Sequence, residues 1–502
     1  MNRYAIVLIF MIMGVCAPVN AQQQPISPND TLVTYNKKPL NGLVEVVGIN
    51  AAVLSWDYFL FDRHWAKVTN KSIKENFTDG WVWDDDSFSG NQFSHPFHGS
   101  LFFNSARENG MSYVQSMLYP ILGSWMWEEV CENNRPAIND LFATGIGGSA
   151  IGEVTHRASD LVFDDSKTGA NRVLREIAGS ILNPVRGVNR LFKGEMFRVN
   201  HESRGKRIEA YPFEFEVGIG SRWIGEITTH PEYGKRYFEN LPVIDSSLDY
   251  GDPFNAIDGG KTTPFDKFEV SATLNLKGNN PTFGFLDISG RILSRQHSLK
   301  HNWSVDWGLY QNFKYVDHYH KDGAIRPGSL PLISEAASFG GGVYVEHEGK
   351  NKIGNLFMLS AVPMGGSASD YYGSDKLMGL DAETKEGLTQ RRYNYGIGFS
   401  IRENIKANIG SRITIGNKFY FLQLYTLNGY NPKAFVEHHN NVMGDKGRQS
   451  ILMNTLYTKI QIAHNVNLRM EYERYHRKGV WDYYPETKNK SHQVKTTLSY
   501  SI

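Results

Sequence analysis

The sequence predicts a mainly β fold, an antiparallel transmembrane β-barrel of about 12 strands preceded by an α-helical N-terminal part. From about residue 200 onward, apolar and polar residues alternate with a period of two. Aromatic residues make up 13% of the chain and glycine occurs 48 times, yet the mean hydropathy is −0.40. This combination is typical of membrane barrels, because outward apolar and inward polar positions cancel in the average.

The first residues, MNRYAIVLIFMIMGVCAPVNAQQQP, have the parts of a secretory signal peptide. Arg3 precedes an apolar stretch of about a dozen residues, and a small-residue cleavage pattern ends at Ala21. The apolar stretch is too short to be a stable membrane-spanning helix, although an N-terminal membrane anchor is the alternative. We therefore expect a signal peptide at 1–21 and a flexible segment at 22–40.

The strand pattern is clearest in short segments beyond residue 200. In FEFEVGIG (Phe213–Gly220), the apolar side chains share one face, whereas Glu214 and Glu216 lie on the other. The chain ends on another alternating segment, VKTTLSYSI, whose last residue is Ile502. Many bacterial outer-membrane barrels end on an aromatic residue, so this chain departs from the usual ending. Such segments predict strands that are apolar toward lipid and polar toward a lumen.

A membrane barrel over residues 200–502 is favoured over a soluble β-sandwich or a water-soluble lipid-carrying barrel. The segments are roughly nine to twelve residues long, which is what a tilted membrane-crossing strand needs. Aromatic residues recur at segment ends, as in interfacial girdles, and short turns alternate with long polar loops. The register is least certain at 237–250 and 418–427. A soluble periplasmic binding module is the third alternative, and it would require the aromatic rows to point inward.

Charge and cysteine content restrict the kinds of partner and of stabilising bond that the protein can have. The 53 Lys and Arg residues nearly balance the 52 Asp and Glu residues, so nothing indicates a nucleic-acid partner. Loss of the signal peptide would remove Cys16 and leave Cys131 as a single thiol, which excludes an intramolecular disulfide. We expect a protein of the outer membrane, in contact with lipid and inserted by the barrel-insertion machinery, with its helical domain facing the periplasm.

Residues 41–193 are predicted to form a helical domain. MSYVQSMLYPILGSWMWEEV, which starts at Met111, has apolar residues at helical spacing, and Pro120 should kink it or begin a new helix. The next segment has a predicted N-cap at Asn139 and small residues four apart, which allow a second helix to approach closely. These small residues are Thr144, Gly148 and Gly152. We expect the helices to plug or line the barrel, or to cover its periplasmic mouth.

Candidate chemistry in the helical domain rests on histidines and carboxylates in apolar surroundings. The candidate catalytic residues are His95, His98, Glu128, Asp140 and His156. His98 with Glu128 or Asp140 could form a general acid–base pair, provided that they come within hydrogen-bonding reach. The alternative is structural: these groups bond one another and polar groups of the barrel wall.

Metal binding is a weaker hypothesis. His95 and His98 could bind an ion with one of the carboxylates Glu128, Glu129 or Asp140, and Asp84 and Asp86 are further candidate ligands. Imidazole and carboxylate groups suit zinc or iron, but histidines that flank Pro96 do not share a helix face as in H-E-x-x-H. WDDDSFSGN suggests calcium but departs from the calcium-loop pattern. We expect no bound cofactor.

Several motif blocks resemble an uncharacterised bacterial family. GWVWDDDSFSGNQFSHPFHGSLFFNSARENG, GSWMWEE, INDLFATGIGGSAIGEV and REIAGSILNPVRGVNRL occur in this order within residues 45–195. Together they are similar to DUF3943, a domain of unknown function whose members are predicted secreted or outer-membrane proteins of Gram-negative bacteria. The resemblance implies location but no activity, so it assigns no catalytic residues.

Two functional hypotheses follow. The first is a structural or passage protein of the outer membrane, in which the helical domain plugs or gates the barrel. The second is a membrane-interface enzyme that acts on lipid or envelope polymer through the His and carboxylate groups of the helical domain.

Overall fold

The computed structural model describes residues 37–84, 86–200, 212–228, 237–254, 262–277, 282–318, 331–368, 393–427, 446–483 and 485–502. The chain forms two compact units, one containing the helices and the other containing the strands together with the short segment Asp86–Ser89. The expected signal peptide and nearly all of the expected flexible segment lie outside the described residues.

The helical unit contains short and medium helices interrupted by π-helical turns. Its α-helices are α2 Pro39–Phe59, α3 Asn70–Asp79, α4 His95–Glu108, α5 Tyr113–Ser116, α6 Leu118–Met126, α7 Ile138–Phe142, α8 Gly148–Val162, α9 Gly169–Leu182 and α10 Pro184–Phe192. Three π-helical turns, η1 Gly90–Ser94, η2 Trp127–Cys131 and η3 Ala143–Gly147, lie beside α4, α6 and α7, and a 3₁₀ turn, η4, covers Glu195–Phe197.

Two local expectations about this unit have different outcomes. A new helix, α6, begins at Leu118 two residues before Pro120, as the proline predicted. The predicted N-cap at Asn139 is wrong: α7 begins at Ile138 with Ala137 at the cap position, so Asn139 lies inside the helix. Its side chain instead bonds other polar groups of the unit.

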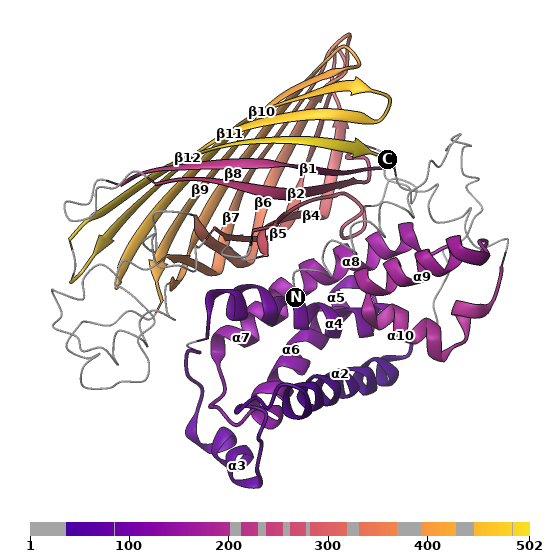
Figure 1. The fold of residues 1–502 in the computed structure, drawn as a ribbon, viewed down its shortest axis with the longest axis vertical. Coiled ribbons are helices and arrows are strands. Elements are labelled where there is room, and N and C mark those ends of the chain that lie inside the picture. Colours follow the sequence, from indigo (N-terminus) through magenta and orange to yellow (C-terminus); the bar gives the residue numbers. More distant parts are fainter. Residues whose placement is uncertain are drawn as a thin grey trace. The chain divides into compact units, whose positions relative to one another are not determined.

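The second unit is a closed antiparallel barrel of twelve strands, which confirms the predicted fold class (Figure 1). Its strands are β1 Phe213–Thr228, β2 Tyr237–Tyr250, β3 Phe268–Asn275, β4 Phe283–Ser298, β5 Trp303–Asp317, β6 Leu332–His347, β7 Lys352–Ala368, β8 Tyr393–Ile409, β9 Ile413–Thr426, β10 Gly447–Ala463, β11 Val466–Trp481 and β12 Thr487–Ser501. Each strand pairs with its sequence neighbour, and β1 closes the ring against β12. Closure pairs the backbone groups that open sheet edges would leave unsatisfied.

The alternation in the sequence corresponds to the two faces of the barrel wall. On β1 and β12, the paired residues Ile219 and Leu498 are 58% and 49% exposed and face outward. Glu216, three positions before Ile219, accepts hydrogen bonds from Lys459 on β10 and from Ser499 on β12. Since β10 does not neighbour β1, the contact with Lys459 crosses the lumen. The outer face is therefore apolar at these positions and the inner face is charged.

The helical unit buries many charged residues beside its apolar core, and it also exposes many apolar side chains. Its buried charged residues are Glu128, Glu129, Asp140, Glu153, Asp164, Arg172, Arg175, Glu176, Arg186 and Arg190. Its exposed apolar residues include Leu40, Val44, Val47, Trp56 and Phe59 on α2, Leu118, Ile121, Leu122 and Trp125 on α6, Val173, Ile177 and Ile181 on α9, and Val188, Leu191 and Phe192 on α10. Among the described helices, only α2 is long and apolar enough to cross a membrane, and just 17% of its most apolar window is buried.

Glycines bring α4 and α8 into close contact. A Cβ atom added at Gly148 would lie 2.6 Å from the backbone carbonyl carbon of Gly99, and one added at Gly152 would lie 2.6 Å from the Phe103 ring. The spacing of small residues in the sequence thus marks a helix-packing face. At Gly148 the added Cβ atom would meet backbone atoms of α4, which cannot move aside as a flexible side chain could.

We predict that Gly148→Ala destabilises the helical unit by about 1–3 kcal/mol through overpacking. Gly48→Ala is the matched control, because a Cβ atom at Gly48 meets nothing within 4 Å and the residue lies inside α2. This control should be neutral or stabilising by up to about 1 kcal/mol. Urea unfolding of the purified chain, followed by far-UV circular dichroism, measures both variants, and equal unfolding midpoints would contradict the packing contact.

Candidate functional site

Charged side chains from non-adjacent strands meet across the barrel lumen. Arg402 on β8 donates hydrogen bonds to Asp287 on β4 at 2.6 Å and to Glu335 on β6 at 2.8 Å. Lys314 also pairs with Asp287, and the Tyr420 hydroxyl donates to Glu335 at 2.7 Å. Glu335 is fully buried, so its charge is compensated by these donors rather than by water. This network joins inward side chains of β4, β5, β6, β8 and β9.

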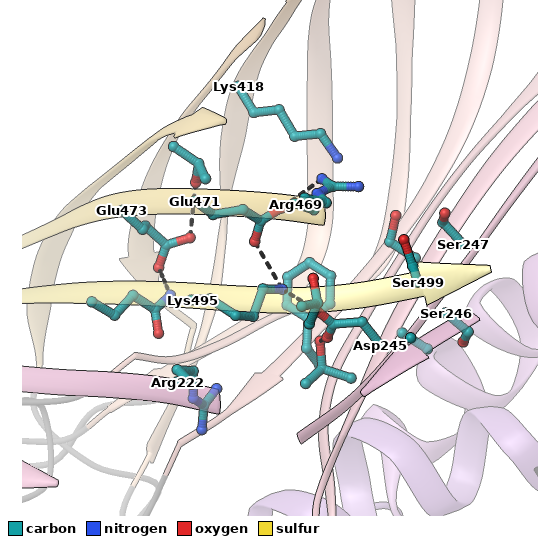
Figure 2. A pocket seen from close by; sticks show the side chains of 18 of the residues that line it. Arg222, Asp245, Ser246, Ser247, Lys418, Arg469, Glu471, Glu473, Lys495 and Ser499 are labelled. Carbon is teal, nitrogen blue, oxygen red and sulfur yellow. Dashed lines mark hydrogen bonds and ion pairs between the residues drawn. The ribbon is translucent and has the colours of Figure 1, made fainter. Parts of the chain in front are cut away.

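A cavity of about 100 Å³ lies among further inward-facing charges. Figure 2 shows Lys495 between two carboxylates, with its Nζ atom 2.7 Å from Asp245 and 2.8 Å from Glu471. Arg469 pairs with the same Glu471 at 2.5 Å, and Glu473 lies farther along β11. The cavity therefore presents charges of both signs, mutually neutralised, and has room for only a small polar solute or a few waters.

An apolar layer lies elsewhere in the lumen. It consists of Val316 on β5, Ile333 on β6, Val362 on β7, Leu422 and Leu424 on β9, Ile451 and Met453 on β10, and two flanking tyrosines, Tyr420 and Tyr475. β5 and β10 are not neighbours in the barrel, so these side chains pack together across its interior. We call this set the apolar lumen layer. Its members come from the inward faces of β5, β6, β7, β9, β10 and β11.

Three of the five predicted catalytic candidates come together in the helical unit. His95 begins α4, Glu128 lies in η2, and Asp140 lies in α7. One ligand-type atom from each lies within 4.8 Å of the others, and His95 Nε2 is 3.8 Å from Asp140 Oδ2. The sequence suggested His95 and His98 with one carboxylate, whereas the structure brings both Glu128 and Asp140 to His95 and leaves His98 out of the group.

Burial and neighbouring charge determine the electrostatics of this His95–Glu128–Asp140 cluster. Burial raises the pKa of Glu128 well above its usual range, and the nearby carboxylates Glu132 and Asp84 raise it further. Burial lowers the pKa of His95, an effect that Asp84 opposes. Asn139 holds two of the neighbouring groups in place. Its amide N–H donates to the Asp140 carboxylate at 2.7 Å, and its amide oxygen accepts from the Asp84 backbone N–H at 2.7 Å.

The other two candidates lie in different surroundings. The His98 ring packs against Phe102 and Trp127, and burial lowers its pKa to about 3, so it is a neutral side chain. His98 is absent from the ligand-type groupings among the described residues. His156 instead bonds Glu108 at 2.8 Å.

Glu108 is the centre of a separate buried ion-pair network. It accepts from His156 at 2.8 Å and from Asn183 at 3.1 Å, and the Arg186 guanidinium lies 3.5 Å away. Arg186 also pairs with Asp160 at 2.5 Å. These groups satisfy one another, which fits a structural role joining α4, α8 and α10.

Two of the metal candidates, Asp84 and His95, lie together in the helical unit, with ligand-type atoms within 4.8 Å of each other. Asp86 is assigned to the barrel unit, where its carbonyl accepts from the Tyr393 hydroxyl at 3.1 Å. In that same grouping, Phe88 stacks on Tyr315. Cys131 is buried, and burial raises the pKa of its thiol to about 11, so it is a poor nucleophile.

Sequence reasoning did not identify the apolar lumen layer. The strand β9 sequence ITIGNKFYFLQLYT is rich in apolar residues on both faces, whereas an ordinary barrel strand alternates apolar and polar residues. That lack of alternation was an available signal for inward apolar residues.

We predict that Glu108 makes the helical unit sensitive to acid. Burial alone would raise the pKa of its carboxyl group, but Arg186 and His156 outweigh burial and lower this pKa from 4.5 to about 2. A lowered carboxyl pKa adds stability above pH about 4.5 that is lost as the pH falls toward about 2. Glu108→Gln should lower the free energy of unfolding by ~3 kcal/mol at neutral pH. It should also weaken the fall in stability between pH about 4.5 and pH about 2, which we call the acid limb of the stability curve.

Urea unfolding at a series of pH values measures this effect. Glu75→Gln, at an exposed ion pair on α3, is the matched control and should follow the wild-type curve. An unchanged acid limb in Glu108→Gln would show that another group determines acid sensitivity.

The chain was compared with known proteins, and both solved barrel structures and one family model match it. No curated protein matches the chain. The chain is similar to an outer membrane channel from Pseudomonas putida F1, with 6% identity, coverage of 57% of this chain and 95% of that chain, and a TM-score of 0.26. It is also similar to the outer membrane channel DcaP of Acinetobacter baumannii, with 7% identity, coverage of 58% and 97%, and a TM-score of 0.23. A third similar structure is OmpT, an outer membrane protein of Vibrio cholerae, with 9% identity, coverage of 58% and 100%, and a TM-score of 0.22. Residues 80–185 match the model of the family described as Domain of unknown function (DUF3943), which confirms the sequence resemblance for this part of the helical unit.

Proposed function

We propose that the chain is an outer-membrane β-barrel of the channel type and that the apolar lumen layer is its gate. The observation that carries the proposal is a closed barrel whose lumen contains paired charges and, beside them, that apolar layer. Hydrophobic constrictions stop ions by excluding water, so a narrow apolar layer closes a pore without a separate plug. Passage would require the side chains of this layer to move or become wetted.

The outer face of β11 and β12 supports a membrane location. Near the chain terminus, the cross-strand pairs are apolar, as in Leu468 opposite Leu498 and Tyr472 opposite Val494. Toward the connection between the two strands, the outward pairs become basic: Arg474 with His492, His476 with Lys490, and Lys478 with Lys488. A sharp change from apolar to basic side chains is expected where lipid tails end and anionic head groups begin.

We propose that the helical unit lies at the lipid surface rather than in the lumen. Its exposed apolar residues on α2, α6, α9 and α10 suit contact with acyl chains, and its charges are ion-paired inside. A polar lumen would leave that apolar surface facing charged walls. Surface helices with exposed apolar faces are typical of proteins bound in the membrane interface.

The membrane-interface enzyme remains the second candidate, favoured by one observation. The His95–Glu128–Asp140 cluster brings an imidazole and two carboxylates together. Catalysis also requires access for a substrate, and Asp140 and Glu128 are almost completely buried. The channel hypothesis therefore has the stronger support.

We predict that Leu422→Ser raises ion conductance severalfold, because a hydroxyl group and a smaller side chain hydrate the apolar lumen layer. Leu456→Ser is the matched control: it makes the same change at a residue that is 52% exposed on the outer face of the barrel. Planar-bilayer recordings of the purified chain measure the effect, and heat-modifiable gel migration confirms that each variant forms a barrel.

Wild-type protein should show small or rare openings, and Leu456→Ser should match it. A large steady wild-type conductance would contradict a closed apolar gate. Equal conductance of the two variants would show that Leu422 does not limit passage.

A further inference from the structure

The His95–Glu128–Asp140 cluster takes no part in the proposed channel function. We propose that these three residues, with Asp84 beside them, bind a divalent transition-metal ion of the zinc class. The ion would join three segments of the helical unit, namely the start of α4, the turn η2 and helix α7.

The spacing of the candidate ligand atoms matches a metal site. All three lie within 4.8 Å of one another, and His95 Nε2 lies 3.8 Å from Asp140 Oδ2. Bonds of ~2.0–2.2 Å to zinc hold neighbouring ligand atoms ~3–4 Å apart. Shifts of under about an ångström in the side chains would therefore complete the coordination.

A second observation points to a cation. Glu128 is only 2% exposed, and its Oε2 atom accepts from the Ala137 backbone N–H at 2.9 Å. Its other oxygen, Oε1, is buried and has no hydrogen-bond partner among the described residues. A buried acceptor without a partner costs about 1–3 kcal/mol, and a bound metal ion would satisfy it.

The surroundings of the cluster resemble the outer shell of a metal site. Asn139 donates to Asp140 and so fixes the orientation of this carboxylate. Hydrogen bonds of this kind typically hold metal-ligating groups in position. The π-helical turns also lie at the cluster: η1 ends immediately before His95, η2 contains Glu128, and η3 begins three residues after Asp140. Such turns re-aim side chains and are frequent at functional sites.

The ligand set indicates the class of metal. One imidazole with carboxylates suits zinc, iron or manganese, whereas calcium prefers six to eight oxygen ligands. The buried cluster offers few oxygen atoms and includes a nitrogen ligand. We therefore expect selectivity for zinc-class ions over calcium.

Isothermal titration of the full chain with zinc sulfate tests the proposal directly. The chain is purified in detergent without a histidine tag and stripped with a chelator, and bound zinc is then counted by elemental analysis. We expect one zinc per chain, unaffected by excess calcium. Glu128→Gln keeps the shape of the side chain but removes its charge, so zinc affinity should fall at least tenfold.

Glu129→Gln is the matched control, because Glu129 is the next residue in η2 and is equally buried but does not belong to the ligand group. It should bind zinc like wild type. The wild-type titration does not depend on the folding of any variant. Far-UV circular dichroism checks that Glu128→Gln and Glu129→Gln are folded. Absence of stoichiometric zinc, equal competition by calcium, or unchanged binding by Glu128→Gln would each overturn the site, and none would affect the channel proposal.

Discussion

The structure depends on one constraint that both units share: charged side chains that are buried must be paired with one another, while many apolar side chains lie on the surface. In the barrel, Arg402, Asp287 and Glu335 meet across the lumen, while Ile219 and Leu498 occupy the outer face. In the helical unit, Arg107 and Arg157 enclose the buried Glu153 at 2.7 and 2.8 Å. Removing one partner from such a buried group leaves an uncompensated charge, so these networks constrain the packing.

The same constraint determines which side chains line the lumen. Most inward charges form pairs, and the apolar lumen layer lies directly beside them, since its Tyr420 donates a hydrogen bond to Glu335. A permanently open pore would instead be lined by solvated groups, as in porins. This is why we propose gated or restricted passage rather than free diffusion. The cluster of His95, Glu128 and Asp140 lies in the other unit and belongs to the internal organisation of that unit.

Much of the fold could be predicted because a strand period of two is local and survives in one sequence. FEFEVGIG indicated the inward position of Glu216, and the twelve-strand estimate is correct. Long-range grouping was harder. His95, Glu128 and Asp140 were identified by residue type, but π-helical turns that no simple period reveals bring them together. Around Leu422 the apolar residues on both faces obscured the register, which hid the lumen layer.

Depth-dependent quenching of site-specific labels tests the central claim most directly. Fluorescent labels are placed at Ile219→Cys on the barrel, Leu43→Cys on α2 and Lys71→Cys on α3, in a chain whose Cys131 is replaced by alanine. Lipids brominated on their acyl chains should quench the first two labels and spare the third, because Ile219 and Leu43 are exposed apolar positions and the Lys71 side chain is 84% exposed. An unquenched label at Ile219 would contradict an outer face in lipid, and one at Leu43 would place the helical unit away from the membrane.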